Sequence, residues 1–300
     1  MAPVIMDGKK LAQQIKDEVR QRVEAMSSRP GLAMVIVGDD PAGQVYESGK
    51  KKDCQQCGIY CDTFRLPREI SREELAGLIE FLNRRDNIDG ILVQFPLPEH
   101  LSARAVQLAI RPDKDVDCVN PVNMGDLMLG VDTFRPCTPA GVMRLLEEYG
   151  VDPAGKRCVM VGRSNIVGKP QAMLMLLGNA TVTICHTWTP DLAAECRRAD
   201  ILITAAGRAG LITGDMVKEG AVVVDIAINR DARGRLRGDV DFDQVSRKAS
   251  YITPVPGGVG PVTRAMLLEN TLKAALRHGK TKKTAEAPGS RGLRAIPPQR

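Results

Sequence analysis

Short β-branched and aliphatic runs alternate with helix-forming segments along most of this chain, and this alternation constrains the fold most strongly. The strands expected in the first half are 32–37, 60–66 and 90–95. The helices expected there are 7–27, 41–57, 71–85 and 102–110. Alternating strands and helices predict a parallel sheet covered by helices, because parallel strands need a crossover connection.

The second half repeats this pattern. Its expected strands are 157–161, 181–185, 201–205, 221–226 and 251–254. Its expected helices are 139–149, 168–177, 191–198 and 262–277. At 300 residues the chain is long enough for two domains of about 150 residues each. We therefore expect an α/β fold with two domains and a boundary near residues 120–138.

The net charge of +6 is concentrated at the C-terminal end. Residues 279–300 hold six basic residues and one acidic residue and have almost no apolar side chains, which predicts a disordered basic tail. The remaining body is nearly neutral, which argues against a nucleic-acid-binding protein. The absence of an apparent signal peptide or an 18-residue apolar run predicts a reduced, cytoplasmic protein that does not enter a membrane.

A glycine-bracketed loop, Gly162-Arg163-Ser164-Asn165-Ile166-Val167-Gly168, stands between an expected strand and an expected helix. Helix N-termini present unpaired N–H groups to anions, and glycines let a pyrophosphate approach the backbone. The motif alone is weak, because an ordinary helix cap can produce it. No acidic residue ends the next expected strand, whereas Arg163 and Thr187 offer a cation and a hydroxyl. This combination favours NADP over NAD.

A second set of polar residues lies in the first half. Tyr46 and Lys50 are four residues apart on one expected helix and share a face. The pair alone is compatible with an exposed lysine beside a half-buried tyrosine. Together with Gln94 and Asp117 it supplies a phenol, an amine, an amide and a carboxylate. Such a set beside a dinucleotide site indicates redox chemistry on a polar organic substrate.

Six segments, in this order, closely resemble the methylenetetrahydrofolate dehydrogenase/cyclohydrolase family, over about residues 3–278. They are Tyr46-x-x-x-Lys50, Val93-Gln94-Phe95-Pro96-Leu97-Pro98, Pro112-Asp113-Lys114-Asp115-Val116-Asp117, Pro136-Cys137-Thr138-Pro139, Gly162-Arg163-Ser164 and Pro254-Val255-Pro256-Gly257-Gly258-Val259-Gly260-Pro261. The resemblance implies a folate-binding catalytic α/β domain (1–137 plus 262–278), a Rossmann-like NADP-binding domain (138–261) and an active-site cleft between them.

The resemblance also implies roles for individual residues. Lys50 would be the catalytic amine, held and tuned by Gln94. Tyr46 would stack on the folate ring system and Asp117 would bind the polar edge of the pterin. The other implied folate contacts are Pro256, Gly257 and Gly258. The implied cofactor contacts are Gly162, Arg163, Ser164, Val167, Thr187, Ile228 and Gly257.

The activity implied is oxidation of 5,10-methylenetetrahydrofolate with NADP, followed by hydrolysis to 10-formyltetrahydrofolate, in a homodimer. Glu47, Cys118 and the 225–229 segment depart from the usual family pattern. Two alternatives stay open: a dehydrogenase that has lost the cyclohydrolase step or prefers NAD, and a non-catalytic dinucleotide-sensing or nucleic-acid-binding protein. No metal is expected, because Cys54, Cys57 and Cys61 have no nearby fourth ligand.

Overall fold

A computed structural model describes residues 2–38, 41–231 and 233–279, and for 41–46 the backbone alone. The side chain of Tyr46 and the predicted tail beyond Gly279 lie outside the described residues. The chain divides into two compact units. The six-stranded unit comprises Met1–Gln13 and Thr138–Thr263, and the three-stranded unit comprises Gln14–Cys137 and Arg264–Arg300.

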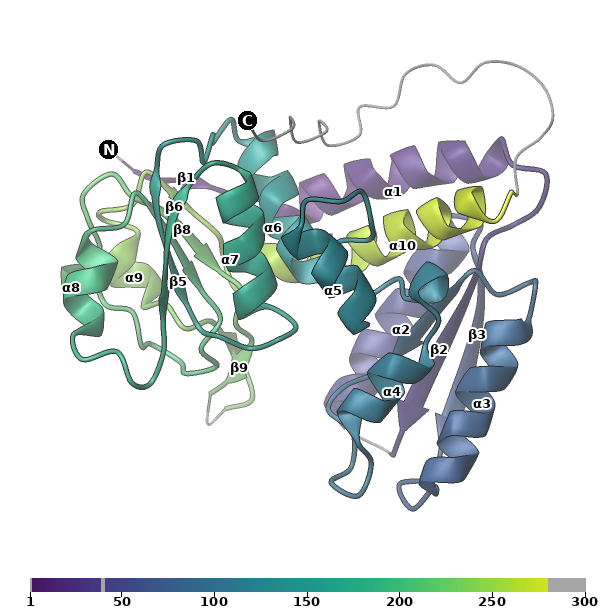
Figure 1. Cartoon of the computed structure of the whole chain (residues 1–300). Helices are drawn as coiled ribbons and strands as arrows, with labels where there is room; N and C mark the ends of the chain where they lie inside the picture. The colour runs from purple at the N-terminus through teal and green to yellow at the C-terminus, as the bar shows by residue number, and fades with distance from the viewer. Residues whose placement is uncertain (1, 39–40, 232, 280–300) are drawn as a thin grey trace. The chain divides into compact units, whose positions relative to one another are not determined.

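The three-stranded unit is built on a parallel sheet with the strand order β3-β2-β4 (Figure 1). The strands are β2 (Gly31–Val37), β3 (Tyr60–Leu66) and β4 (Gly90–Val93). The helices that connect them, and the helix that follows β4, are α2 (Pro41–Gln56), α3 (Arg72–Arg84) and α4 (Ala103–Ala109). All three predicted strands are confirmed, and β4 ends two residues earlier than expected.

Helix α3 begins with the capping box that the sequence predicts. The Ser71 hydroxyl accepts a hydrogen bond from the Glu74 N–H at 3.2 Å, and the Glu74 carboxylate accepts one from the Ser71 N–H at 3.0 Å. Leu75, Ile79 and Leu82 then recur on the buried face. They pack in one apolar cluster with residues of β2, β4 and α4, so α3 and α4 cover the same face of the sheet.

A turn and two helices complete this unit. The turn η1 (Pro112–Lys114) leads to α5 (Pro121–Met128), and the chain returns with the later part of α10 (Val259–Arg277). The buried carboxylate of Asp115 fixes the turn by accepting hydrogen bonds from the Val119 N–H and the Asn120 N–H. Asn270 of α10 donates its amide hydrogens to the Val116 and Arg135 carbonyls at 2.8 and 2.9 Å. These bonds hold the segment that carries Asp117.

The six-stranded unit contains a fully parallel sheet with the order β1-β11-β8-β7-β5-β6 (Figure 1). Its strands are β1 (Val4–Ile5), β5 (Arg157–Val161), β6 (Thr181–Cys185), β7 (Ile201–Thr204), β8 (Val222–Asp225) and β11 (Tyr251–Ile252). Strands β7 and β8 are wholly buried, as expected of central parallel strands. The chain moves from β5 outward to β6 and then back to β7 on the other side, which creates a topological switch point.

Helices and short elements surround this sheet. They are α1 (Gly8–Glu24), α6 (Cys137–Glu148), α7 (Gly168–Leu177), α8 (Leu192–Arg197), η2 (Gly214–Met216), α9 (Phe242–Val245) and the hairpin strands β9 (Asn229–Arg230) and β10 (Leu236–Arg237). Helix α1 starts in this unit and continues into the other. The predicted cap of α1 is confirmed, because Asp7 accepts hydrogen bonds from the Lys9 and Lys10 N–H groups.

Strand β1, the β9–β10 hairpin and helices α5 and α9 were not among the elements expected from the sequence. Strands of two residues are too short to show a period, and helices of four and eight residues show little more than one or two turns. Within residues 2–38, 41–231 and 233–279, no helix combines the length and apolar character that crossing a bilayer demands.

Candidate active site

Lys50 and Gln94 form a direct contact in the three-stranded unit. The Lys50 ammonium on α2 donates a hydrogen bond to Gln94 Oε1 at 2.8 Å. Gln94 follows β4, and its N–H donates to the Val35 carbonyl at 2.9 Å, which continues the pairing of β4 with β2. The Gln94 side-chain amide also donates to the Phe95 carbonyl at 3.1 Å. Because its NH₂ group is engaged in this way, the amide oxygen is turned toward the lysine.

Burial shifts the proton affinities of Lys50 and Asp117 in opposite directions. Desolvation lowers the pKa of Lys50 below its usual value, although the Asp117 carboxylate opposes that change. Desolvation raises the pKa of Asp117 to about 6, although Lys50 and a hydrogen bond from the Cys137 thiol oppose that rise. The neutral forms of both groups therefore become accessible closer to neutral pH than usual, which suits proton transfer.

Cys137 also belongs to this cluster. From the sequence it was noted only as part of a motif, with no role of its own. The thiol is buried at the start of α6 and lies near the Val116 carbonyl and the Asp117 carboxylate. Asn270 Nδ2 lies 3.7 Å from Cys137 Sγ. The Pro136-Cys137-Thr138-Pro139 motif was the available signal, but it does not by itself show which side chain the thiol faces.

Glu47 stands one turn before Lys50 and departs from the usual family pattern. It is 6% exposed, and its carboxylate forms an ion pair with Arg65 Nη2 at 2.9 Å. Glu47 borders the same small recess as Lys50 and Gln94. A buried carboxylate is tolerated here because a guanidinium partner stands on the neighbouring strand β3. Tyr46 belongs to the backbone of the same helix, and its side chain lies outside the described residues.

The glycine loop follows β5, at the switch point of the six-stranded sheet. Gly162 has a φ of +124°, and a Cβ at this position would lie 2.6 Å from the Ala205 carbonyl oxygen. A side chain here is therefore excluded both by conformation and by space. A Cβ on Gly168 would lie 2.3 Å from the Gly162 oxygen. The two glycines let the turn close tightly before α7, the geometry that a pyrophosphate-binding turn requires.

The Ser164 hydroxyl covers the start of α7, whose N-cap residue is Val167. It accepts hydrogen bonds from the Val167 and Gly168 N–H groups, both at 3.2 Å. Two of the N–H groups at this helix start are thus satisfied within the protein. Arg163 is exposed and stands at the entrance of the loop. The Arg163 guanidinium is therefore more accessible to an anion than the two N–H groups that are bonded to Ser164.

Two other predicted cofactor residues follow the carboxyl ends of strands in the same sheet. Thr187 lies just after β6 and is exposed, and Ile228 lies just after β8 and is 48% exposed. In parallel sheets these ends form one edge, where ligands of α/β proteins bind. No acidic residue occurs between β6 and Thr187, as the sequence analysis noted for an NADP site. The carboxyl-terminal end of the six-stranded sheet thus carries Gly162, Arg163, Thr187 and Ile228.

The Pro256–Gly258 segment is tied to the start of α1. Gly257 has a φ of +111°, and its carbonyl accepts a hydrogen bond from the Gly8 N–H at 3.0 Å. A Cβ on Gly8 would lie 1.7 Å from the Gly258 oxygen, so the two backbones touch. Pro256 is exposed. This contact fixes the segment after β11 at the same sheet edge.

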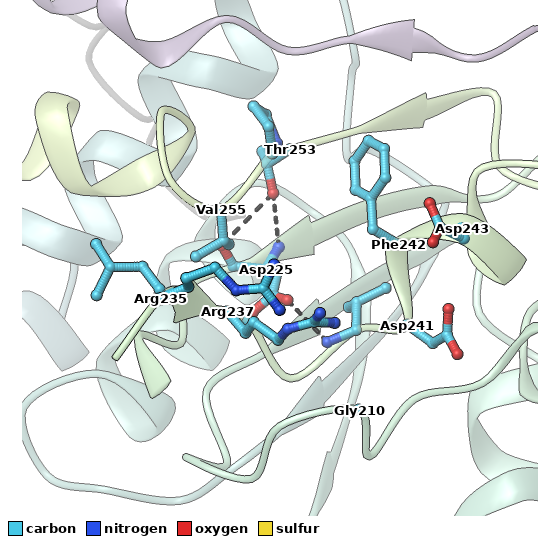
Figure 2. A pocket seen from close by; sticks show the side chains of 13 residues that line it. Gly210, Asp225, Arg235, Arg237, Asp241, Phe242, Asp243, Thr253 and Val255 are labelled. Atoms are coloured by element: carbon cyan, nitrogen blue, oxygen red, sulfur yellow. Dashed lines mark hydrogen bonds between the residues drawn. The ribbon is translucent and has the colours of Figure 1, made fainter. Parts of the chain in front are cut away.

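Asp225 and Thr253 brace the strands that lead to this edge. Figure 2 shows both residues on the wall of a cavity of about 500 Å³. The Thr253 hydroxyl accepts a hydrogen bond from the Asp225 N–H at 2.8 Å. Burial raises the pKa of Asp225 to about 6, although hydrogen bonds from backbone N–H groups, including that of Val240, oppose the rise. The Asp225 N–H thus links β8 to the residue that follows β11, and its carboxylate holds the Asp239 and Val240 N–H groups as a structural acid.

Among the described residues, no three His, Cys, Asp or Glu side chains group to hold a metal ion.

Two family models match the chain. The tetrahydrofolate dehydrogenase/cyclohydrolase catalytic domain matches residues 6–117, and the NAD(P)-binding domain of the same family matches residues 136–279. A bifunctional FolD protein of Moorella thermoacetica is 55% identical over 280 residues, which is 92% of this chain and 100% of that protein.

The chain belongs to the tetrahydrofolate dehydrogenase/cyclohydrolase family.

Solved structures agree with this membership. The bifunctional FolD enzyme of Campylobacter jejuni superposes with a TM-score of 0.91 at 48% identity, covering 92% of this chain and 99% of that one. The FolD enzyme of Trypanosoma brucei, solved with NADP and an inhibitor, superposes with a TM-score of 0.90 at 39% identity, covering 94% and 100%. The resemblance inferred from the sequence is thereby confirmed. The chain is an enzyme with the dehydrogenase and cyclohydrolase activities of this family.

Proposed function

We propose that this chain oxidises 5,10-methylenetetrahydrofolate with NADP and then hydrolyses the methenyl product to 10-formyltetrahydrofolate, with Lys50 as the proton-transfer residue. The observation that supports this proposal most is the Lys50–Gln94 hydrogen bond beside Asp117, within a chain that carries both family domains. We assign folate binding to residues 1–137 plus 262–278, and dinucleotide binding to 138–261.

The dehydrogenase step needs positioning more than proton transfer. Bound NADP would accept the hydride that leaves the methylene carbon of the folate. The two nitrogens beside that carbon stabilise the cation that remains, so no side chain need supply a base. The residues of this chain would orient the two reactants. Gly257 and Ile228 would contact the nicotinamide end, and Pro256, Gly257 and Gly258 the folate. Tight backbone contact between Gly8 and Gly257 suits such positioning.

The cyclohydrolase step needs a group that accepts and then returns a proton. Water would add to the methenyl carbon while neutral Lys50 takes up the water proton. The bond from that carbon to one ring nitrogen would then break as the carbon–oxygen double bond forms and the hydroxyl proton leaves to solvent. The proton held by Lys50 would pass to the freed nitrogen to leave the 10-formyl product. Gln94 orients the amine by hydrogen bonding, and burial favours its neutral form. Asp117 would bind the pterin, and Tyr46 would stack on it.

NADP is the cofactor we propose, rather than NAD. Arg163 is exposed at the glycine loop, and Thr187 follows β6 without an acidic neighbour between them. A guanidinium and a hydroxyl suit the additional 2′-phosphate of NADP. The related Trypanosoma brucei enzyme was solved as a complex with NADP. Ser164, whose hydroxyl covers the start of α7, would contribute by shaping the turn as well as by contact.

The expected homodimer and cytoplasmic location also belong to this proposal. Strand β6 ends the order of the six-stranded sheet, and three of its five residues, including Ile184, are exposed. An exposed edge strand offers unpaired backbone groups to a second copy. Sedimentation equilibrium of the purified protein would test the homodimer, and a monomer at micromolar concentration would refute it.

The first experiment is to mix the protein with 5,10-methylenetetrahydrofolate and NADP and to follow NADPH and the methenyl intermediate together. NADPH formation with little accumulation of methenyl would support both activities. NADPH with accumulating methenyl would leave a dehydrogenase alone. A repeat with NAD tests the cofactor choice. Reduction of neither cofactor by folded protein that binds folate would refute the proposal.

A further inference from the structure

Arg264 forms an ion pair on the helix that carries Lys50. Its Nε lies 3.2 Å from Asp53 Oδ2, and Asp53 stands three residues after Lys50 on α2. The other carboxylate oxygen of Asp53 lies 3.2 Å from the Lys16 ammonium of α1. Asp53 is 6% exposed, so its charge needs partners in place. Two cations around one carboxylate leave this group of three side chains with a net charge of +1.

Gly49 makes room for the Arg264 side chain. A Cβ at position 49 would lie 2.1 Å from Arg264 Nη1 and 3.2 Å from its Cζ. The guanidinium therefore rests directly on the backbone of α2, at the residue before Lys50. No larger residue fits at position 49 while Arg264 keeps this position. The Arg264 guanidinium fills the space that the missing side chain of Gly49 leaves. This contact fixes α2 against α10 next to the Lys50 amine.

The charge of Arg264 acts on the Lys50 amine. The groups that face Lys50 come from helices α2, α6 and α10 and from the segments after β4 and η1. They are Gln94, Asp117, Cys137, Cys54, Glu47 and Arg264. Burial is the largest cause of the lowered pKa of Lys50. Asp117 and the thiols of Cys137 and Cys54 oppose it, and Arg264 adds the smallest of these contributions, in the lowering direction. A guanidinium keeps its charge at every working pH, so this contribution is constant.

We propose that Arg264 is a positioning residue for the proton-transfer step: seated on Gly49 and held by Asp53, it fixes α2 and keeps a permanent positive charge beside the Lys50 amine. The amine is thereby favoured in the neutral form that accepts a proton from water. This inference rests on the proposed role of Lys50 in the cyclohydrolase reaction. It adds a residue from α10, more than 200 positions away in the sequence, to the machinery of that step.

The pH profile of the cyclohydrolase reaction tests this role, with 5,10-methenyltetrahydrofolate supplied directly. In Arg264→Met the rising limb of the kcat profile should move to higher pH, and kcat near neutral pH should fall about threefold. KM for the folate should change little. Arg264→Lys, which keeps the charge, should restore much of the profile. The matched control is Lys16→Met, which removes the other partner of Asp53 and should leave the profile in place.

Gly49→Ala provides a second, independent variant. Its Cβ should push the guanidinium away from α2 and shift the profile in the same direction, and the double variant Gly49→Ala/Arg264→Met should show no further shift. Retained dehydrogenase activity reports that each variant is folded. An unmoved profile in Arg264→Met, or an equal shift in Lys16→Met, would overturn the inference. Lys50→Met separates the two proposals: if it keeps cyclohydrolase activity, the role of Lys50 itself fails.

Discussion

The two units prepare for chemistry in different ways. The three-stranded unit brings side chains from distant segments into a half-buried cluster, in which Lys50, Gln94 and Asp117 alter one another's hydrogen bonding and charge. The six-stranded unit presents backbone, glycine and exposed side chains along one sheet edge. Proton transfer requires tuned groups, whereas positioning a dinucleotide requires close approach of backbone. The comparison thus separates the two proposed steps by the kind of structure each one needs.

Two acids, Asp117 and Asp225, make the same contrast. Asp117 and Asp225 both have a pKa raised to about 6 by burial. Asp117 is compensated by the Lys50 ammonium and a thiol, which are groups that can themselves exchange protons. Asp225 is compensated by backbone N–H groups, such as that of Val240, which cannot. The same shift therefore accompanies an acid beside proton-exchanging groups in one unit and an acid held by backbone N–H groups in the other.

The largest expected effect tests the three-stranded unit. Lys50→Met should lower cyclohydrolase kcat by about 10²- to 10⁴-fold, because the proton acceptor is lost, and should leave part of the dehydrogenase activity. Stopped-flow absorbance with each substrate in turn measures the two steps. Lys52→Met, which changes an exposed lysine on the same helix, serves as the control. Equal loss of both activities would break the separation between the units.

The variant Gly162→Ala tests the six-stranded unit. Its Cβ would meet the Ala205 carbonyl at 2.6 Å in a backbone conformation that alanine rarely adopts, so the turn must distort. KM for NADP should rise about tenfold to a hundredfold, and cyclohydrolase activity on supplied methenyltetrahydrofolate should persist. Gly77→Ala, where nothing lies within 4 Å, is the matched control. Loss of the cyclohydrolase activity as well would contradict independent roles.

Asp225→Asn sharpens the contrast between the two acids. Since the folded pKa of Asp225 lies above the unfolded value, its charged form costs stability, and this cost appears as pH rises from about 4 to about 6. Across that window the free energy of unfolding of the wild type should fall by about 2 kcal/mol relative to that of the variant. Urea unfolding followed by circular dichroism at several pH values measures the difference. A pH-independent difference would mean that Asp225 does not titrate in this range.

The smallest effect concerns cofactor choice. Arg163→Met should raise KM for NADP about fivefold to tenfold and leave KM for NAD nearly unchanged, because only NADP carries the 2′-phosphate. Steady-state dehydrogenase assays with both cofactors measure this. Lys169→Met removes another exposed cation near the same loop and should have little effect. A parallel rise for both cofactors would instead place Arg163 at the shared pyrophosphate.

Local patterns made most of the fold predictable. The capping box at Ser71, the cap at Asp7 and the β-branched strands are written in consecutive residues, and all three are confirmed. Lys50 and Gln94 could be named from their motifs, and the structure brings them together. The contact between Gly49 and Arg264 could not be found this way, because it depends on two helices meeting in three dimensions. Ser164 is a second example, since the local motif did not reveal which N–H groups donate hydrogen bonds to its hydroxyl.

The pairing of β1 with β11 has a consequence for how the chain is made. Val4 and Ile5 are synthesised long before their partners, Tyr251 and Ile252. Strand β1 therefore cannot join the six-stranded sheet until β11 has left the ribosome. The three-stranded sheet, whose strands are all made before residue 94, can form much earlier. The nascent chain thus carries β1 without its partner strand until β11 has been made.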